Sequence, residues 1–171
     1  GKQTGDTRAR GENDVDDIEA RLLSVFGLSE LAADDSAPVD TVELPVRPPV
    51  LCPGCPHRGS FYAVKKALGK TPAVYCGDIG CYTLGNAKPL DAVDTCLCMG
   101  AGITMAQGFA IADPDKKAIA FVGDSTFFAS GTTGISNAAY NGHDITVVVL
   151  DNATTAMTGA QPHPGTGVTL M

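Results

Sequence analysis

The chain has 171 residues and a formal net charge of −7, a length that allows one domain with a substantial hydrophobic core. Hydrophobic residues make up 44% of it and charged residues 18%, and the 20 glycines are typical of an α/β domain with many tight turns. The chain is too poor in basic residues for a nucleic-acid-binding surface. No apolar run approaches the roughly 20 residues of a membrane span. Nucleic acid and membrane are therefore excluded as expected partners.

The negative charge is concentrated near the N-terminus, because residues 1–40 hold 10 of the 19 acidic residues and only 4 of the 12 basic ones. A short amphipathic helix is expected within residues 13–31, where apolar residues recur at near-helical spacing: Val15, Ile18, Leu22, Val25 and Phe26. The prolines of residues 37–50 predict an extended connector. We therefore expect residues 1–46 to be an acidic linker with a short helix, and residues 47–171 to form the domain proper.

From Cys52 onward, segments with helical and strand patterns alternate. Helices are expected over residues 59–70, 99–113 and 126–142, and strands over residues 73–80, 117–124 and 145–152. The strands are apolar along their length and are separated by helices, which is typical of a parallel sheet buried on both sides. The sequence thus predicts an α/β fold, a parallel sheet covered by helices on both faces.

Two oxygen-bearing side chains lie at the carboxyl ends of the last two predicted strands. They are Asp124 and Asn152, and 25 residues, about one crossover helix with its loops, separate the Gly-Asp-Ser and Asp-Asn segments. Ligands of open α/β sheets gather outside the carboxyl ends of strands, and hard oxygen donors suit Mg²⁺. Gly123, Ser125 and Thr126 lie where backbone N–H groups at a helix start bind phosphate. The alternative is a helix cap at Asp124 and a chain turn at Asn152, which the spacing disfavours.

These segments resemble the thiamine diphosphate motif, in which Gly-Asp-Gly is followed one crossover later by Asn. Ser125 departs from this motif, although serine is nearly as small as the usual glycine. Together with CPGCPHRGSFYAVKKAL, GDIGCYTLG, VDTCLCMGAG and LDNATTAMTGAQPHPGTG, the motif is similar to the alpha subunits of indolepyruvate:ferredoxin oxidoreductases, within the 2-oxoacid:ferredoxin oxidoreductase superfamily. The resemblance covers about residues 47–169 and implies a thiamine-diphosphate-binding fold, its diphosphate-binding half.

The resemblance also implies a binding site for thiamine diphosphate and Mg²⁺. The side chains of Asp124 and Asn152 and the backbone carbonyl of Thr154 would be the protein ligands of the ion. The diphosphate would meet the turn at residues 123–126 and the loop at residues 158–161, and the GDIGC and CMGA segments would lie by the rings of the cofactor. The cofactor-binding residues implied in this way are Gly80, Cys81, Cys98, Met99, Gly100, Gly123, Asp124, Ser125, Thr126, Asn152, Thr154, Thr158 and Gly159.

The six cysteines come without a secretory signal, which favours thiols or metal ligands over disulfides and predicts a cytoplasmic protein. Cys52 and Cys55 form a CxxC motif before a predicted helix. This motif occurs in three kinds of site: redox-active dithiols, zinc sites and iron–sulfur clusters. No second CxxC follows at zinc-finger spacing, and a thioredoxin-like fold would not supply the Asp124–Asn152 pair. In related 2-oxoacid:ferredoxin oxidoreductases, cysteines matching Cys52, Cys55 and Cys81 help to hold a [4Fe–4S] cluster. Structural or substrate-lining thiols are the alternative.

Three further cysteines are expected to have no ligand role. Cys96 and Cys98 flank one residue just before a glycine-rich turn, a position typical of pocket lining, and Cys76 lies in a predicted strand and is expected to be buried. The histidines are expected to be solvated loop or surface-turn residues: His57, His163 and His143.

The resemblance implies oxidative decarboxylation of aryl 2-oxoacids, indolepyruvate among them, to acyl-CoA, with electrons passing through iron–sulfur clusters to ferredoxin. No catalytic residue is predicted within the chain, because the activating glutamate of such enzymes belongs to a separate pyrimidine-binding domain. Further expected partners are a ferredoxin-like domain of the same subunit, a beta subunit, ferredoxin, coenzyme A and the 2-oxoacid. The chain begins without Met and stops after a glycine-rich turn, so we expect a piece of a longer protein, inactive by itself.

Three other functions are compatible with parts of this pattern. Another 2-oxoacid:ferredoxin oxidoreductase would share most of the motifs. A generic thiamine diphosphate decarboxylase or synthase module would share the Asp124–Asn152 pair but not the CPGC and GDIGC turns. A non-enzymatic module that binds Mg²⁺ and a nucleotide would show no preference for thiamine diphosphate.

Overall fold

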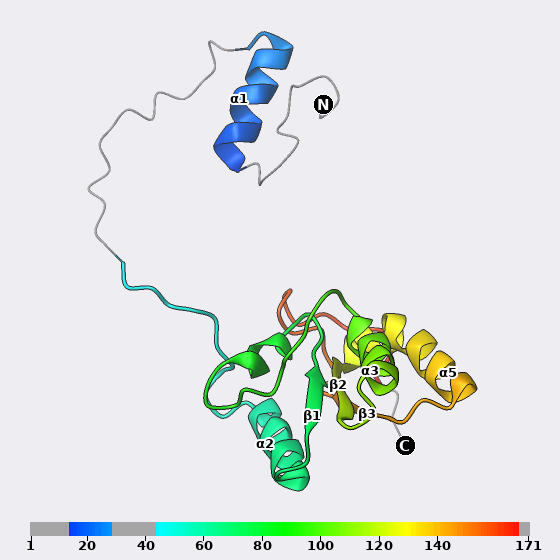
Figure 1. Ribbon diagram of the computed structural model, residues 1–171. Coiled ribbons are helices and arrows are strands. Elements are labelled where there is room, and N and C mark those ends of the chain that lie inside the picture. Colours follow the sequence, from blue (N-terminus) through cyan, green and yellow to red (C-terminus); the bar gives the residue numbers. More distant parts are fainter. Residues whose placement is uncertain (1–13, 29–43, 168–171) are drawn as a thin grey trace. The chain divides into compact units, whose positions relative to one another are not determined.

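A computed structural model of the chain describes residues 14–28 and 44–167. The chain divides between Val46 and Arg47 into two compact units, which are described separately. Helix α1 belongs to the first unit, and the second unit contains a three-stranded sheet with the remaining helices (Figure 1). None of the helices in these described ranges is long and apolar enough to cross a membrane.

The first unit contains the amphipathic helix that the sequence predicts, α1, Val15–Phe26. Its start is capped by Asp14, whose side chain accepts the N–H of Asp17 at 2.7 Å. Gly27 ends the helix in a left-handed conformation with φ of 67°, which glycine adopts without strain. Of the predicted connector, residues 44–50 carry no regular structure, and the part before residue 44 lies outside the described residues.

The sheet of the second unit is parallel, as predicted. Its strands β1, β2 and β3 lie in chain order, so β2 is central. Their bounds are Ala73–Cys76, Lys117–Gly123 and Ile145–Leu150. β1 is shorter than the predicted strand, because the chain leaves the sheet at Gly77, whose N–H bonds to the Thr95 carbonyl. The register pairs Gly123 with Leu150, so both strands end at the same edge of the sheet.

One face of the sheet is covered by helices α3, Ala101–Ala112, and α5, Thr132–Asn141. Side chains alternate between the two faces of a strand, so Ala118, Ala120 and Val122 of β2 all point toward this face. They form one cluster with Ile103 of α3. Gly134 of α5 sits so close to Ile103 that an added Cβ would lie 2.9 Å from it. The cluster therefore depends on a small residue in α5.

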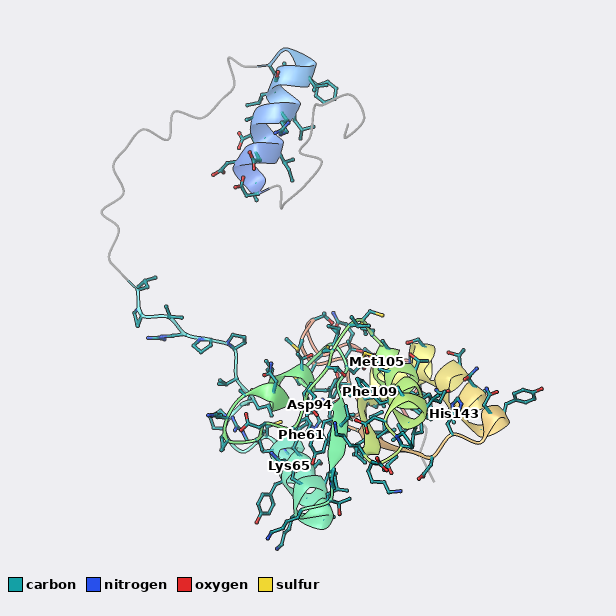
Figure 2. The ribbon with its side chains drawn as sticks, in the orientation of Figure 1. Phe61, Lys65, Asp94, Met105, Phe109 and His143 are labelled. Atoms are coloured by element: carbon teal, nitrogen blue, oxygen red, sulfur yellow. The ribbon has the colours of Figure 1, made fainter. Side chains whose placement is uncertain are left out.

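The opposite face is covered by helix α2, Pro56–Leu68. Phe61 of α2, labelled in Figure 2, is fully buried. It packs on Phe121 of β2, with ring centroids 4.6 Å apart. α2 begins at Pro56, earlier than the predicted residue 59, because proline fits the first helical position, where no intrahelical N–H bond is lost. Helices thus cover both faces of the sheet, as the sequence predicts.

The chain after β2 differs from the single predicted helix over residues 126–142. A short helix, α4, Asp124–Thr126, passes into a π-helical turn, η3, Phe127–Gly131, before α5 begins. π-helical turns inside helices are often found at functional sites. Here the turn lies directly after Asp124, at the edge of the sheet where the strands end.

Candidate functional site

Acidic or amide side chains follow all three strands where they end. Asp78 comes two residues after β1, Asp124 directly after β2, and Asn152 two residues after β3. Because the strands are parallel, these ends lie at one edge of the sheet, the edge at which α/β proteins bind ligands. The structure therefore brings Asp124 and Asn152 together, and it adds Asp78, which the sequence analysis did not single out.

Asp124 is fully buried and only partly paired. Its Oδ2 accepts the backbone N–H of Asn152 at 3.3 Å and lies 3.0 Å from Nε2 of His163. Its Oδ1 is also buried and has no hydrogen-bond partner among the described residues. A buried carboxylate oxygen without a partner is costly, and it is explained when an ion or ligand belongs there.

The charge state of Asp124 is set by two opposing effects. Burial disfavours its ionised form, but interactions with the backbone of Ser125 and with the side chains of Asp151 and His163 outweigh burial. The pKa of the Asp124 carboxyl therefore lies below its ordinary value. Asp124 is thus a buried anion, and a nearby cation would neutralise it.

The loop after β3 is held in a defined conformation beside Asp124. Asn152 Oδ1 accepts the N–H of Thr154 at 3.3 Å, and Thr155 pairs with Gln161 through backbone hydrogen bonds. Ala153 has a φ of 58°, a left-handed conformation uncommon for alanine. The hydroxyl of Thr155 donates to that of Ser125 at 2.8 Å, so the residue that departs from the thiamine diphosphate motif ties this loop to α4.

A pocket of about 340 Å³ opens between this loop and the GDIGC turn. Several of the predicted cofactor-binding residues line it: Gly80, Cys81, Met99, Ser125, Thr126, Asn152 and Thr158. Other lining residues were not predicted: Ile79, Tyr82, Thr155, Ala156 and Met157. The predicted residues that do not line it are Cys98, Gly100, Gly123, Asp124, Thr154 and Gly159. The pocket therefore combines a mostly apolar wall with hydroxyl and amide groups, as ligand sites do.

Two buried residues of this region were not predicted from the sequence: Tyr82, which lines the pocket, and Asp78, which does not. Tyr82 packs directly on Gly123, so that a Cβ added to Gly123 would lie 1.9 Å from its ring. Burial raises the pKa of Tyr82, and nearby Asp124 adds to the effect, so the phenol stays protonated. Asp78 is fully buried, accepts the N–H of Gly100 at 2.8 Å and leaves Oδ2 unpaired within the described structure. Asp78 is, like Asp124, a carboxylate at the end of a strand, and this sequence signal could have found it.

The predictions for the histidines were partly wrong. His57 is a buried residue of α2, 5% exposed and 5.5 Å from the ring of Tyr82, and burial lowers its pKa, although Asp124 opposes this. His163 is also not solvated, because its side chain is 3% exposed and contacts Asp124. His143 does follow α5 in a turn, but its Nδ1 lies 3.0 Å from Oε1 of the buried Gln107. Loop position alone did not predict burial.

The three cysteines of the predicted cluster are free thiols. Burial raises the pKa of Cys81, and electrostatic interaction with Cys55 and Cys52 adds to the effect. Within residues 14–28 and 44–167, however, no three His, Cys, Asp or Glu side chains form a group that could hold a metal ion. A cluster at these cysteines therefore stays a prediction.

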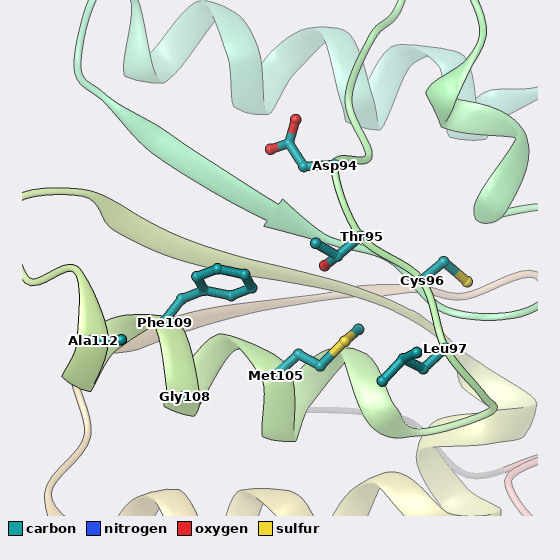
Figure 3. A pocket seen from close by; sticks show the side chains of 8 residues that line it. All are labelled: Asp94, Thr95, Cys96, Leu97, Met105, Gly108, Phe109 and Ala112. Atoms are coloured by element: carbon teal, nitrogen blue, oxygen red, sulfur yellow. The ribbon is translucent and has the colours of Figure 1, made fainter.

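The other cysteines lie as follows. Cys76 is fully buried in the core, as predicted. Cys98 is exposed and does not line the 340 Å³ pocket. Cys96 lines a second pocket, of about 610 Å³, between residues 94–97 and the side chains of Met105 and Phe109 on α3 (Figure 3). Neither Cys96 nor Cys98 lines the 340 Å³ pocket, and their expected place beside the cofactor stays a prediction.

Comparison with known proteins agrees with this geometry. A family profile described as "Thiamine pyrophosphate enzyme, C-terminal TPP binding domain" matches residues 78–171, more than half of the chain. The chain belongs to this family of thiamine diphosphate-binding domains. The sheet edge with Asp124 and Asn152 lies within the matched range.

The relatives are more specific. The chain is 43% identical over 172 residues to indolepyruvate oxidoreductase subunit IorA of Archaeoglobus fulgidus, covering 98% of this chain and 27% of that protein. It is 51% identical over 140 residues to the subunit IorA of Pyrococcus abyssi, covering 74% of this chain and 21% of that protein. The chain thus spans about a quarter of the length of these relatives. The predicted resemblance to indolepyruvate:ferredoxin oxidoreductase alpha subunits is confirmed.

A solved structure shares the fold. The 2-oxoglutarate:ferredoxin oxidoreductase from Magnetococcus marinus, with 2-oxoglutarate, coenzyme A and succinyl-CoA bound, superposes with a TM-score of 0.58 and 26% sequence identity. The match covers 69% of this chain and 42% of that one. The predicted α/β fold class is therefore confirmed by a structural relative as well as by the sheet itself.

Proposed function

We propose that the chain is the diphosphate- and Mg²⁺-binding part of a thiamine diphosphate-dependent 2-oxoacid:ferredoxin oxidoreductase that acts on indolepyruvate. The single observation that carries the proposal is the buried Asp124 at the strand edge: its Oδ2 accepts the N–H of Asn152, and its Oδ1 has no hydrogen-bond partner among the described residues. The IorA relatives support the reaction and the substrate. Residues 47–171 would be the binding domain, and residues 1–46 a linker with one helix.

The residues present fit a bound Mg²⁺. Oδ1 of Asp124 is a buried carboxylate oxygen with no partner in residues 14–28 and 44–167, and the amide of Asn152 and the carbonyl of Thr154 are hard oxygen donors of the kind that Mg²⁺ prefers. Only one of these is a carboxylate, which agrees with the lack of a three-residue acidic or histidine cluster in the described parts of the chain. Asp124, Asn152 and Thr154 would hold the ion.

When bound, thiamine diphosphate supplies a nucleophilic carbon and an electron sink for decarboxylation of a 2-oxoacid. The chain contributes binding and orientation. Ser125 and Thr126 present backbone and hydroxyl groups to the pocket at the start of α4. Ile79, Met99 and Met157 give the pocket an apolar wall. The neutral phenol of Tyr82 closes the pocket above Gly123.

The site is completed by other parts of the enzyme. We propose that a pyrimidine-binding domain supplies the activating glutamate, and that a ferredoxin-like domain, a beta subunit, ferredoxin and coenzyme A take part in the full reaction. Cys52, Cys55 and Cys81 would contribute thiolates to a [4Fe–4S] cluster. All six cysteines are free thiols, which is typical of the cytoplasm.

The test compares substrates and cofactors in the full-length enzyme. We expect reduction of ferredoxin with indolepyruvate and coenzyme A, and a slower rate with 2-oxoglutarate. Acyl-CoA should form in step with ferredoxin reduction. Non-oxidative decarboxylation without ferredoxin reduction would instead indicate a decarboxylase or synthase module. Equal binding of ATP and thiamine diphosphate in the presence of Mg²⁺ would refute the assignment in favour of a nucleotide-binding module.

A further inference from the structure

The imidazole of His163 has a defined proton position. Its Nδ1 accepts the backbone N–H of Gly165 at 3.1 Å, so the ring proton resides on Nε2. Nε2 lies 3.0 Å from Oδ2 of Asp124, and the two side chains are 3% and 0% exposed. His163 therefore donates a hydrogen bond to a buried carboxylate from a loop that follows Asp124 by 39 residues.

This hydrogen bond fixes the orientation of the Asp124 carboxylate. The terminal torsion of an aspartate is soft and broad by itself. Here Oδ2 accepts two hydrogen bonds, one from Nε2–H of His163 at 3.0 Å and one from the N–H of Asn152 at 3.3 Å. Oδ1 is left without a partner in the described structure. The two donors hold one oxygen and so determine where the other one points.

The loop around His163 is built to hold the ring in place. The imidazole stacks on the ring of Phe128, with centroids 6.1 Å apart and planes at 25°. Gly165 lies so close to Phe128 that an added Cβ would be 1.9 Å from that ring. The N–H of His163 also donates to the hydroxyl of Thr166 at 2.9 Å. Phe128 belongs to the π-helical turn that follows Asp124, so one segment carries the carboxylate and supports the imidazole.

We infer that His163 is a positioning residue for the divalent cation. It holds Asp124 so that Oδ1 faces the ion, and it couples the loop after β3 to the cation site. The inference rests on the proposed function, because it requires Asp124 to bind Mg²⁺. Outer hydrogen-bond partners of metal ligands typically contribute about 10- to 100-fold in metal affinity, and this is the size of effect we expect.

Two substitutions separate the hydrogen bond from the packing of the ring. In His163→Gln, a side-chain amide N–H replaces the Nε2 donor, but the ring that stacks on Phe128 is lost. In His163→Phe, the ring is kept and the donor is lost. His143→Gln is the control, because His143 contacts Gln107 and does not contact Asp124. The full-length enzyme is titrated with thiamine diphosphate at several Mg²⁺ concentrations, and Mn²⁺ binding is followed by electron paramagnetic resonance.

We expect the wild type and His143→Gln to bind Mg²⁺ and Mn²⁺ with equal affinity, and His163→Gln to bind them slightly more weakly. His163→Phe should bind both ions about 10- to 100-fold more weakly than the wild type. Circular dichroism and thermal unfolding without cofactor should show that all variants are folded. Metal affinity of His163→Phe equal to the wild type, or losses as large in His163→Gln as in His163→Phe, would overturn the inference. A wild-type protein that binds no thiamine diphosphate with Mg²⁺ would refute the proposed function itself, which is a separate result.

Discussion

The contact between Gly123 and Tyr82 allows a quantitative test of how the pocket is built. Gly123 has a φ of −78°, which any residue adopts, so alanine would meet no backbone strain there. A Cβ at this position would nevertheless lie 1.9 Å from both Cζ and the hydroxyl oxygen of Tyr82. Ordinary contacts between heavy atoms are about 3.5–4.0 Å, so the phenol ring would have to move by roughly 1.5–2 Å.

The expected effect of Gly123→Ala follows from this displacement. Tyr82 is 8% exposed and is packed in the core, so its movement would disturb close packing and destabilise the domain by about 1–3 kcal/mol. By the same movement the ring would enter the 340 Å³ pocket that it lines and would weaken thiamine diphosphate binding. Both losses have one steric cause.

The assay is urea unfolding combined with calorimetric titration of thiamine diphosphate. Gly108→Ala is the matched control, because nothing lies within 4 Å of its added Cβ in α3, and it should gain up to about 1 kcal/mol from helix propensity. Tyr82→Leu should relieve the clash, so Gly123→Ala would destabilise less in that background, and a double-mutant cycle measures the difference. Unchanged stability of Gly123→Ala, or strict additivity with Tyr82→Leu, would refute the reasoning.

Two further predictions concern buried polar groups. Burial raises the pKa of Asp78, so ionisation of this side chain destabilises the folded state. The destabilisation is absent at pH values below the pKa of aspartate in the unfolded chain, which is about 4. It is complete at pH values above the pKa of Asp78 in the folded protein. Asp78→Asn, which can still accept the Gly100 N–H, should therefore stabilise more at about pH 8 than at about pH 4 in urea unfolding, and a gain that falls as pH rises would contradict this. The side chain of Gln107 donates to the Gly134 carbonyl at 3.0 Å and contacts His143. Gln107→Leu should therefore lower the free energy of unfolding by about 1–3 kcal/mol and leave thiamine diphosphate affinity unchanged. An altered affinity would show that α5 and the site are coupled.

Much of the fold was predictable because its signals are local. The apolar runs of β2 and β3 mark these strands to within two residues, whereas the start of α2 was predicted three residues late, because the proline at its first position was not used as a start signal. The end of β1 was not predictable in this way, because it depends on a hydrogen bond from Gly77 to Thr95, a contact outside the strand's own sequence. The π-helical turn inside the predicted helix over residues 126–142 was missed too, since its residues have no distinct periodicity.

The site shows the same division. Asp124 and Asn152 could be paired from the sequence because parallel strands bring their carboxyl ends together. His163 could not be placed, because its burial depends on stacking with Phe128 and on contact with Asp124, 39 residues earlier in the chain. Tyr82 was missed because the sequence does not show that its ring packs against Gly123. This contact is possible only because Gly123 has no side chain, and it becomes visible only in the packed structure.

The most direct test of the account is Mg²⁺-dependent binding of thiamine diphosphate to the full-length protein and to its Asp124→Ala variant. Removing Asp124 deletes the only carboxylate of the proposed ligand set, whose Oδ1 has no other partner in the described structure. We predict that the wild type binds thiamine diphosphate with Mg²⁺, that a chelator abolishes binding, and that the folded Asp124→Ala variant loses the Mg²⁺-dependent binding. Equal affinity and equal Mg²⁺ dependence of the variant and the wild type would contradict the account.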